Sequence, residues 1–289
     1  MNYALDALWW RLQTPQVRDL ATLLTAPAPW HTSCELPVTQ LLGNEGFRFL
    51  LNLDTHPQNL LSFLNKQPPH HNRLGIYAEQ LLCFWFQYAP HCQLIGSNLL
   101  IVQNKQSLGA ADFIVKIDQK HFHLELTCKY YGAAQLEMTA FAGLNHTDRL
   151  VNKVNKLEKQ LTLLRQLPLS VLPEVNINIA NLPSASIVRG MLFTPQAKMY
   201  HHPVINRFCW QGYWINKWTD WPVNLHKDKR FWTHKRLSLL APARISSEET
   251  MTFEQVKHVE HGILAILQQR ADGYWHEVDR IMKINNDEN

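Results

Sequence analysis

Apolar residues that recur every three or four positions mark two long helices in this chain. The first runs from Leu74 to Gln87 and the second from Thr147 to Gln166, and in both the apolar positions fall on one face. Glu79 is the only formal charge in the first helix, and an isolated charge in so apolar a segment needs an explanation. The apolar stripes are Leu74, Ala78, Leu81, Leu82 and Trp85 in the first helix, and Leu150, Val154, Leu157, Leu161 and Leu164 in the second.

Runs rich in β-branched and aromatic residues predict strands between and after these helices. Two of them, Ala111–Ile117 and His121–Tyr130, are separated by a turn at Asp118–Lys120. The other predicted strands are Asn98–Gln103, Val175–Ile179 and Ile187–Phe193. The order of helix, three strands, helix and strand predicts an α/β fold with a mixed central sheet flanked by helices.

Shorter patterns predict elements on both sides of this central part. Helices are expected over Tyr3–Gln13, Gln16–Leu24, Gln58–Asn65 and, near the other end, Thr252–Arg270. Thr14–Pro15 is expected to cap the second of them, and a short strand is expected near Phe47–Leu53. We therefore predict one domain in three parts: N-terminal helices in residues 1–72, a core in residues 73–194 and a C-terminal part in residues 195–289 packed on that core.

Composition bounds the class of protein. Of 289 residues, 46% are hydrophobic and 18% charged, so a sizeable core can form. No run of 18 apolar residues exists, which predicts a protein without a membrane span. The five cysteines have no zinc-site spacing, and their scatter indicates reduced thiols in a cytoplasmic protein. The net charge of +4 is compatible with a nucleic-acid partner without requiring one.

Two carboxylates lie in the otherwise apolar strands of the predicted hairpin. Asp112 is in the first strand and Glu125 in the second. Because residues two apart share a face of a strand, Glu125, Thr127 and Lys129 point one way. Asp112 on the neighbouring strand can join them. The alternative is a surface hairpin with a cross-strand pair of an acid and a lysine.

This arrangement resembles the core of the PD-(D/E)XK nucleases. The matching residues are Asp112, Glu125 and Lys129. Ala111 replaces the family's proline, and Lys129 follows the acid by four positions instead of two, about 6–7 Å further along the strand. The resemblance implies a restriction-endonuclease-like core over residues 73–194 and a metal-dependent nuclease acting on DNA in preference to RNA.

The same resemblance implies roles for individual residues. Asp112, Glu125 and Glu79 would hold Mg²⁺ or Mn²⁺, with the backbone carbonyl of Leu126 as a further ligand. Lys129 would orient the attacking water or stabilise the charge of the transition state. Lys153, Lys156 and Gln160, on the polar face of the second helix, would meet the nucleic-acid phosphates. The alternative for both lysines is an ordinary solvated helix face.

A second resemblance is closer. The segments GIYAEQLLCFWF, GAADFIV, HLELTCKYY and DRLVNKVNKLEKQL are similar to the bacterial family labelled domain of unknown function 1853. In that family the lysine also follows the acid by four positions. The resemblance implies the nuclease-like fold and no particular substrate. The rival function is a catalytically inactive module that keeps the fold and binds nucleic acid or protein.

The C-terminal part contributes aromatic and basic residues. Residues 208–236 contain five of the ten tryptophans, interleaved with lysine and arginine. Such a segment could stack bases and bind a backbone, but the favoured interpretation is that the tryptophans pack a β-rich lobe. His121 and His123 alternate in a strand; they could flank the acids, and a plain surface position is the favoured interpretation.

Overall fold

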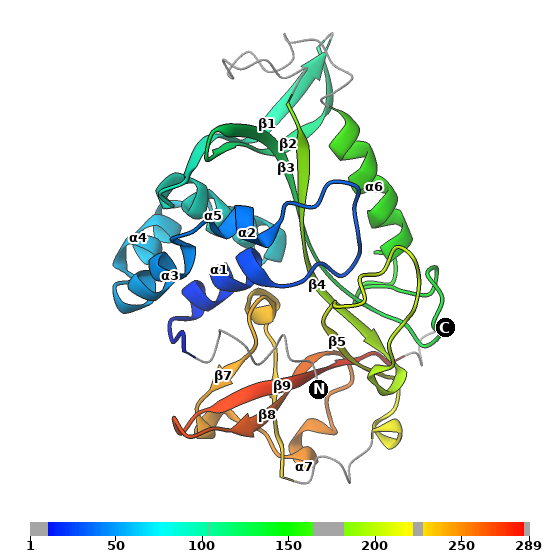
Figure 1. The fold of residues 1–289 in the computed structure, drawn as a ribbon. Helices are drawn as coiled ribbons and strands as arrows, with labels where there is room; N and C mark the ends of the chain where they lie inside the picture. The colour runs from blue at the N-terminus through cyan, green and yellow to red at the C-terminus, as the bar shows by residue number, and fades with distance from the viewer. Residues whose placement is uncertain (1–10, 104, 164–181, 222–227, 286–289) are drawn as a thin grey trace.

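A computed structural model describes residues 11–103, 105–163, 182–221 and 228–285 of the chain (Figure 1). Its strands form one mixed sheet of nine strands in the order β1-β2-β3-β4-β5-β9-β8-β6, and β7 pairs with β9. The strands are β1 Cys92–Gln103, β2 Gln106–Ile117, β3 Lys120–Gly132, β4 Ser184–Thr194, β5 Gln211–Ile215, β6 Arg230–Thr233, β7 Arg244–Ile245, β8 Gly262–Gln269 and β9 Trp275–Lys283.

The central part has the predicted order of elements. Helix α5 (Leu74–Tyr88) is followed by β1, β2 and β3, then by α6 (Leu150–Leu163) and β4. The first three strands form an antiparallel meander, and β4 lies parallel to β3. Strand β1 begins six residues before the predicted Asn98. The predicted strand Val175–Ile179 lies outside the described residues.

Helices α5 and α6 cover opposite faces of the sheet (Figure 1). Alternation of side chains along the strands explains this arrangement. On β4, Ile187 and Met191 face the cluster that contains α5, whereas Val188 and Leu192 face the cluster built on Leu157 and Leu161 of α6. Within the described residues, no helix is long and apolar enough to cross a membrane.

The N-terminal helices pack beside α5. They are α1 Pro15–Thr25, α2 Val38–Leu42, α3 Gly46–Thr55 and α4 Gln58–Lys66, so the predicted helices Gln16–Leu24 and Gln58–Asn65 are confirmed. Pro15 takes the first helical position, but the Thr14 side chain makes no cap hydrogen bond. In the predicted helix Tyr3–Gln13, residues 1–10 lie outside the described part and residues 11–13 are not helical.

The predicted strand Phe47–Leu53 is wrong, because this segment belongs to α3. Leu50 and Leu53 are buried three positions apart while Phe47 and Leu51 are exposed, which is the pattern of a helix with one buried face. The intrinsic strand preference of phenylalanine was overridden by this packing.

The predicted helix Thr252–Arg270 is also wrong. Only one turn, α7 (Phe253–Val256), is helical, and β8 follows. Strand β8 begins at Gly262, whose φ is +145°. Ile263 to Leu267 are all buried because β8 is covered on both faces, and a continuous apolar run of this length also satisfies a helical template.

The tryptophans of residues 208–236 are structural. Trp210 is buried in the α5 cluster, and Trp214 packs against the same cluster. Trp218 and Trp221 belong to a second cluster with β8 and β9, and Trp232 packs in a third. The interpretation that they pack a β-rich lobe is confirmed, and this lobe continues the central sheet through β5 and β9.

Candidate functional site

The two predicted strand acids meet where β2 and β3 separate. Their ladder runs from Ile117–Lys120 to Phe113–Leu124 and stops there. One residue further along β2, the Asp112 carboxylate takes the place of the missing ladder bond, since its Oδ2 accepts from the backbone N–H of Leu126 at 2.8 Å. The carboxylate is thereby fixed in the gap between the strands.

Glu125 is buried beside this gap, with 2% of its surface exposed. Its Oε1 lies 2.8 Å from Nε2 of His123, and its Oε2 accepts from Nε2 of Gln160 at 2.8 Å. The other ring nitrogen of His123 lies 3.2 Å from Ser184 Oγ. A surface position for His123 is therefore wrong. The strand alternation that placed it on the face of Glu125 was the signal for its role in holding that carboxylate.

Glu79 completes a group of three interacting acids. It is half-buried on α5, and its Oε2 accepts from Asn98 Nδ2 at 3.2 Å. Burial and the charge of Glu125 raise the pKa of Glu79. Burial, the charge of Glu125 and that of Glu79 raise the pKa of Asp112 to about 7, against the Leu126 hydrogen bond and the charge of Lys153. Negative charge is therefore under-compensated here, a condition that favours a bound cation.

Lys129 forms an ion pair with Asp148, which the sequence did not indicate. Its Nζ donates to Asp148 Oδ2 at 2.5 Å, and the Tyr131 hydroxyl donates to Asp148 Oδ1 at 3.0 Å. Asp148 lies just before the second long helix, which begins at Leu150 and not at the predicted Thr147. Thr147 bonds Asn145 in the preceding turn.

Strand β4 fits closely behind Lys129. Gly190 is its register partner, and a Cβ built at Gly190 would lie 1.6 Å from the Lys129 carbonyl oxygen. The φ of Gly190, +140°, is also one that side chains disfavour. Only glycine allows β3 and β4 to approach in this way at the level of the lysine.

Helix α6 brings its polar face to the acids. Gln160 is bonded to Glu125, Lys153 is half-buried, and Lys156 is exposed. Burial, together with the charges of Lys129 and Lys156, lowers the pKa of Lys153, against the charges of Asp112 and Glu125. Gln160 is therefore part of the hydrogen-bond network of the acids, whereas Lys153 is only partly withdrawn from solvent and Lys156 lies on a solvated face.

These residues surround one cleft of about 830 Å³. It contains every predicted site residue except Glu125, whose partner Gln160 does line it. Five lysine and arginine side chains face three acids in its lining, so the cleft favours an anionic ligand. The basic lining residues are Arg73, Lys129, Lys153, Lys156 and Arg236, and the acidic ones are Glu79, Asp112 and Asp148.

The C-terminal part supplies a wall of the cleft that the sequence did not predict. This wall consists of His234, Arg236, Leu239 and residues 261–263. Tyr130 donates to the Leu239 carbonyl at 2.6 Å and ties the wall to β3. Of the lysines and arginines interleaved with the tryptophans in residues 208–236, Arg236 lines the cleft, and Lys227 lies outside the described residues.

A buried ion cluster holds this wall in place. Arg280 donates to the carbonyl of Leu239 at 2.7 Å and to both carboxylate oxygens of Glu277, at 2.5 and 3.0 Å. Glu277 also accepts from the backbone N–H of Ala243 at 2.6 Å and lies 3.1 Å from His234 Nε2. The segment from His234 to Ala243 is therefore anchored to β9.

The donor set at the acids fits a hard cation. In the described part of the chain, the buried atoms Thr127 Oγ1 and Gln160 Oε1 have no hydrogen-bond partner, and both residues line the cleft. No three Asp, Glu, His or Cys side chains of the described residues are grouped closely enough to hold a metal by themselves. A cation here would take further ligands from backbone carbonyls, waters or a bound phosphate, which Mg²⁺ accepts.

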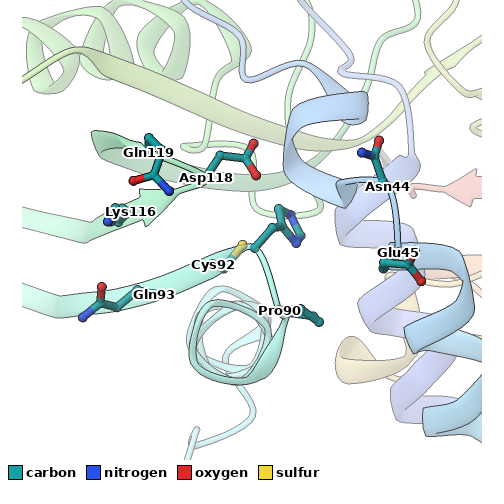
Figure 2. Close-up of a pocket in the computed structure, with 9 residues that line it drawn as sticks. Asn44, Glu45, Pro90, Cys92, Gln93, Lys116, Asp118 and Gln119 are labelled. Atoms are coloured by element: carbon teal, nitrogen blue, oxygen red, sulfur yellow. The ribbon is translucent and has the colours of Figure 1, made fainter.

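A second pocket, of about 480 Å³, lies at the far end of β2 and β3 and contains none of the predicted site residues. Figure 2 shows the turn at Asp118 on one side of it and the segment of Asn44 and Glu45 on the other, with Cys92 at the start of β1 below Asp118. Its lining is mostly exposed, so we assign it no chemistry.

Comparison with known proteins places the chain in a family. No curated protein and no solved structure matches it. One family model, described as "Domain of unknown function (DUF1853)", matches residues 7–284. Because this match covers nearly the whole sequence, the chain belongs to the DUF1853 family.

Proposed function

We propose that this protein hydrolyses phosphodiester bonds of nucleic acid, DNA in preference to RNA, with Mg²⁺ or Mn²⁺ as cofactor. We further propose that residues 73–194 form a restriction-endonuclease-like core. The observation that carries this proposal is the meeting of Asp112 and Glu125 at the end of the β2–β3 ladder, where Asp112 lines a cleft otherwise dominated by positive charge and Glu125 is buried beside it.

Asp112 and Glu125 would hold the metal, and Glu79 would approach it from α5. The bound ion would activate a water and neutralise charge on the phosphate. The chain's own contribution is to fix both carboxylates before substrate arrives. The N–H of Leu126 fixes Asp112, while His123 and Gln160 fix Glu125 from two sides.

The remaining side chains would bind and orient the substrate. Arg73 lies just before α5, Lys153 and Lys156 lie on α6, and Arg236 lies on the C-terminal wall. Cations on facing walls can hold successive phosphates of one strand, so that one phosphate is presented to the acids. Salt would then weaken binding steeply, because each phosphate contact releases counterions.

One observation favours the rival, a binding module without catalysis. Both carboxylate oxygens of Glu125 already have hydrogen-bond partners, and its side chain is almost fully buried. In that case the cleft would bind nucleic acid through its cations, and the acids would be structural.

A cleavage assay separates the two functions. The wild-type protein is incubated with single- and double-stranded DNA and RNA in Mg²⁺, Mn²⁺ or EDTA, beside Glu125→Gln and Asp112→Asn. Glu158→Gln is the matched control, since Glu158 is an exposed acid of α6 outside the cleft. Metal-dependent cleavage that both site variants lose and the control keeps supports the hydrolase. Binding without cleavage in any metal supports the module.

A further inference from the structure

The lysine that the sequence pairs with the acids is occupied elsewhere. Lys129 donates to Asp148, and Asp148 is itself held by the Tyr131 hydroxyl and by the turn that begins at Asn145. Releasing Lys129 toward the acids would leave Asp148 without its cation in the same cleft. Through its contact with Asp148, Lys129 is positioned to stabilise the loop before α6.

Lys153 is oriented toward the acids by its helix. Gln160 anchors α6 to Glu125, and Lys153 lies seven residues before it, which is about two turns and 10.5 Å along the same face. Lys153 lines the cleft together with Asp112. Among the described residues, its ammonium group has no ion-pair or hydrogen-bond partner, so it is available to a ligand.

We infer that Lys153 of α6, and not Lys129 of β3, is the lysine that contacts the phosphate undergoing cleavage. This inference rests on the proposed hydrolase function and assigns one residue of its site. The ammonium group would stabilise negative charge developing on the phosphate oxygens, whereas Lys129 would act as a positioning residue through Asp148. The partly desolvated setting of Lys153 strengthens that interaction.

The test compares lysines on the substrate that the wild-type protein cleaves. Turnover in Mg²⁺ and binding of the same fluorescent oligonucleotide in Ca²⁺ are measured for Lys153→Met, Lys129→Met and Lys153→Arg. Lys159→Met is the matched control, because Lys159 is exposed on α6 and does not line the cleft. Thermal unfolding verifies that each variant is folded.

We expect Lys153→Met to lower kcat by about 10²–10³-fold, as when a group that stabilises transition-state charge is removed, with a much smaller loss of binding. Lys153→Arg should recover part of the rate. Lys129→Met should lower kcat less than about tenfold, and Lys159→Met should match the wild type.

A loss of kcat for Lys129→Met that equals or exceeds the loss for Lys153→Met would overturn the inference. So would a Lys153→Met protein that retains more than about a tenth of the rate. In both outcomes the wild-type protein still cleaves and the hydrolase proposal stands. Absence of cleavage by the wild-type protein overturns both proposals.

Discussion

Replacing Glu277 by glutamine tests the ion cluster that anchors the C-terminal wall of the cleft. Glu277 is fully buried, and the change removes its charge while keeping its shape. Arg280 would then be a buried cation without its carboxylate. Breaking a buried pair from one side generally lowers stability by about 3–5 kcal/mol.

The pKa of Glu277 determines how this loss of stability depends on pH. Burial alone would raise this pKa, but the charges of Arg280 and His234 and the hydrogen bonds from both lower it from 4.5 to about 2. The carboxylate of Glu277 is therefore held in its ionised form by these partners in the folded protein. Since the folded pKa is depressed, this stability is present above pH 4.5 and is lost as the pH falls toward 2.

Urea unfolding of both proteins at pH 7 and at pH 3 measures the effect. We expect Glu277→Gln to unfold with about 3 kcal/mol less free energy at pH 7 and with a smaller difference at pH 3. Glu254→Gln is the control, because Glu254 pairs with Lys257 on the surface and should change stability by less than about 1 kcal/mol. A loss below about 1 kcal/mol at pH 7, or one that is the same at both pH values, would refute this account of the cluster.

Two further predictions concern the acids and the strand behind them. Gly190→Ala should lower the melting temperature far more than Gly262→Ala. Both glycines have φ near +140°, but only a Cβ at position 190 would meet a backbone oxygen. Equal losses of melting temperature in the two variants would contradict the predicted clash. Asp112→Asn should raise the melting temperature at pH 8 without metal, since it removes a buried charge repelled by Glu125 and Glu79. The same variant should lose the stabilisation that we expect Mg²⁺ to give the wild type. A melting temperature below that of the wild type without metal would show that the charge of Asp112 is compensated.

The long helices, the hairpin and the position of the acids were predictable because each depends on local spacing. Period-two alternation was enough to place Glu125 and Leu124 on opposite faces of the strand, and the structure shows α6 on the face of Glu125 and the α5 cluster on the face of Leu124. The failures have physical causes of another kind. Strand β8 is buried on both faces, so its apolar run carries no alternation that could distinguish it from a helix.

Other parts of the site depend on contacts between segments far apart in the chain. Nothing around Asp148 indicates that it would bond a lysine 19 residues earlier. The C-terminal wall likewise depends on how Arg280 and Glu277 hold residues 234–243, and sequence spacing does not encode such a contact. His123 was within reach of prediction, because it shares a strand face with Glu125.

The place of β9 in the sheet has a consequence for the order of folding. It is the last strand that the structure describes, yet it lies between β5 and β8 in the interior of the sheet. A nascent chain therefore leaves the edges of β5 and β8 unpaired until residues 275–283 emerge from the ribosome. The meander of β1, β2 and β3, which carries Asp112 and Glu125, can form earlier from local contacts. The C-terminal wall of the cleft can form only after Arg280 has been synthesised. We therefore expect the acids to be in place during synthesis before the cleft around them is closed.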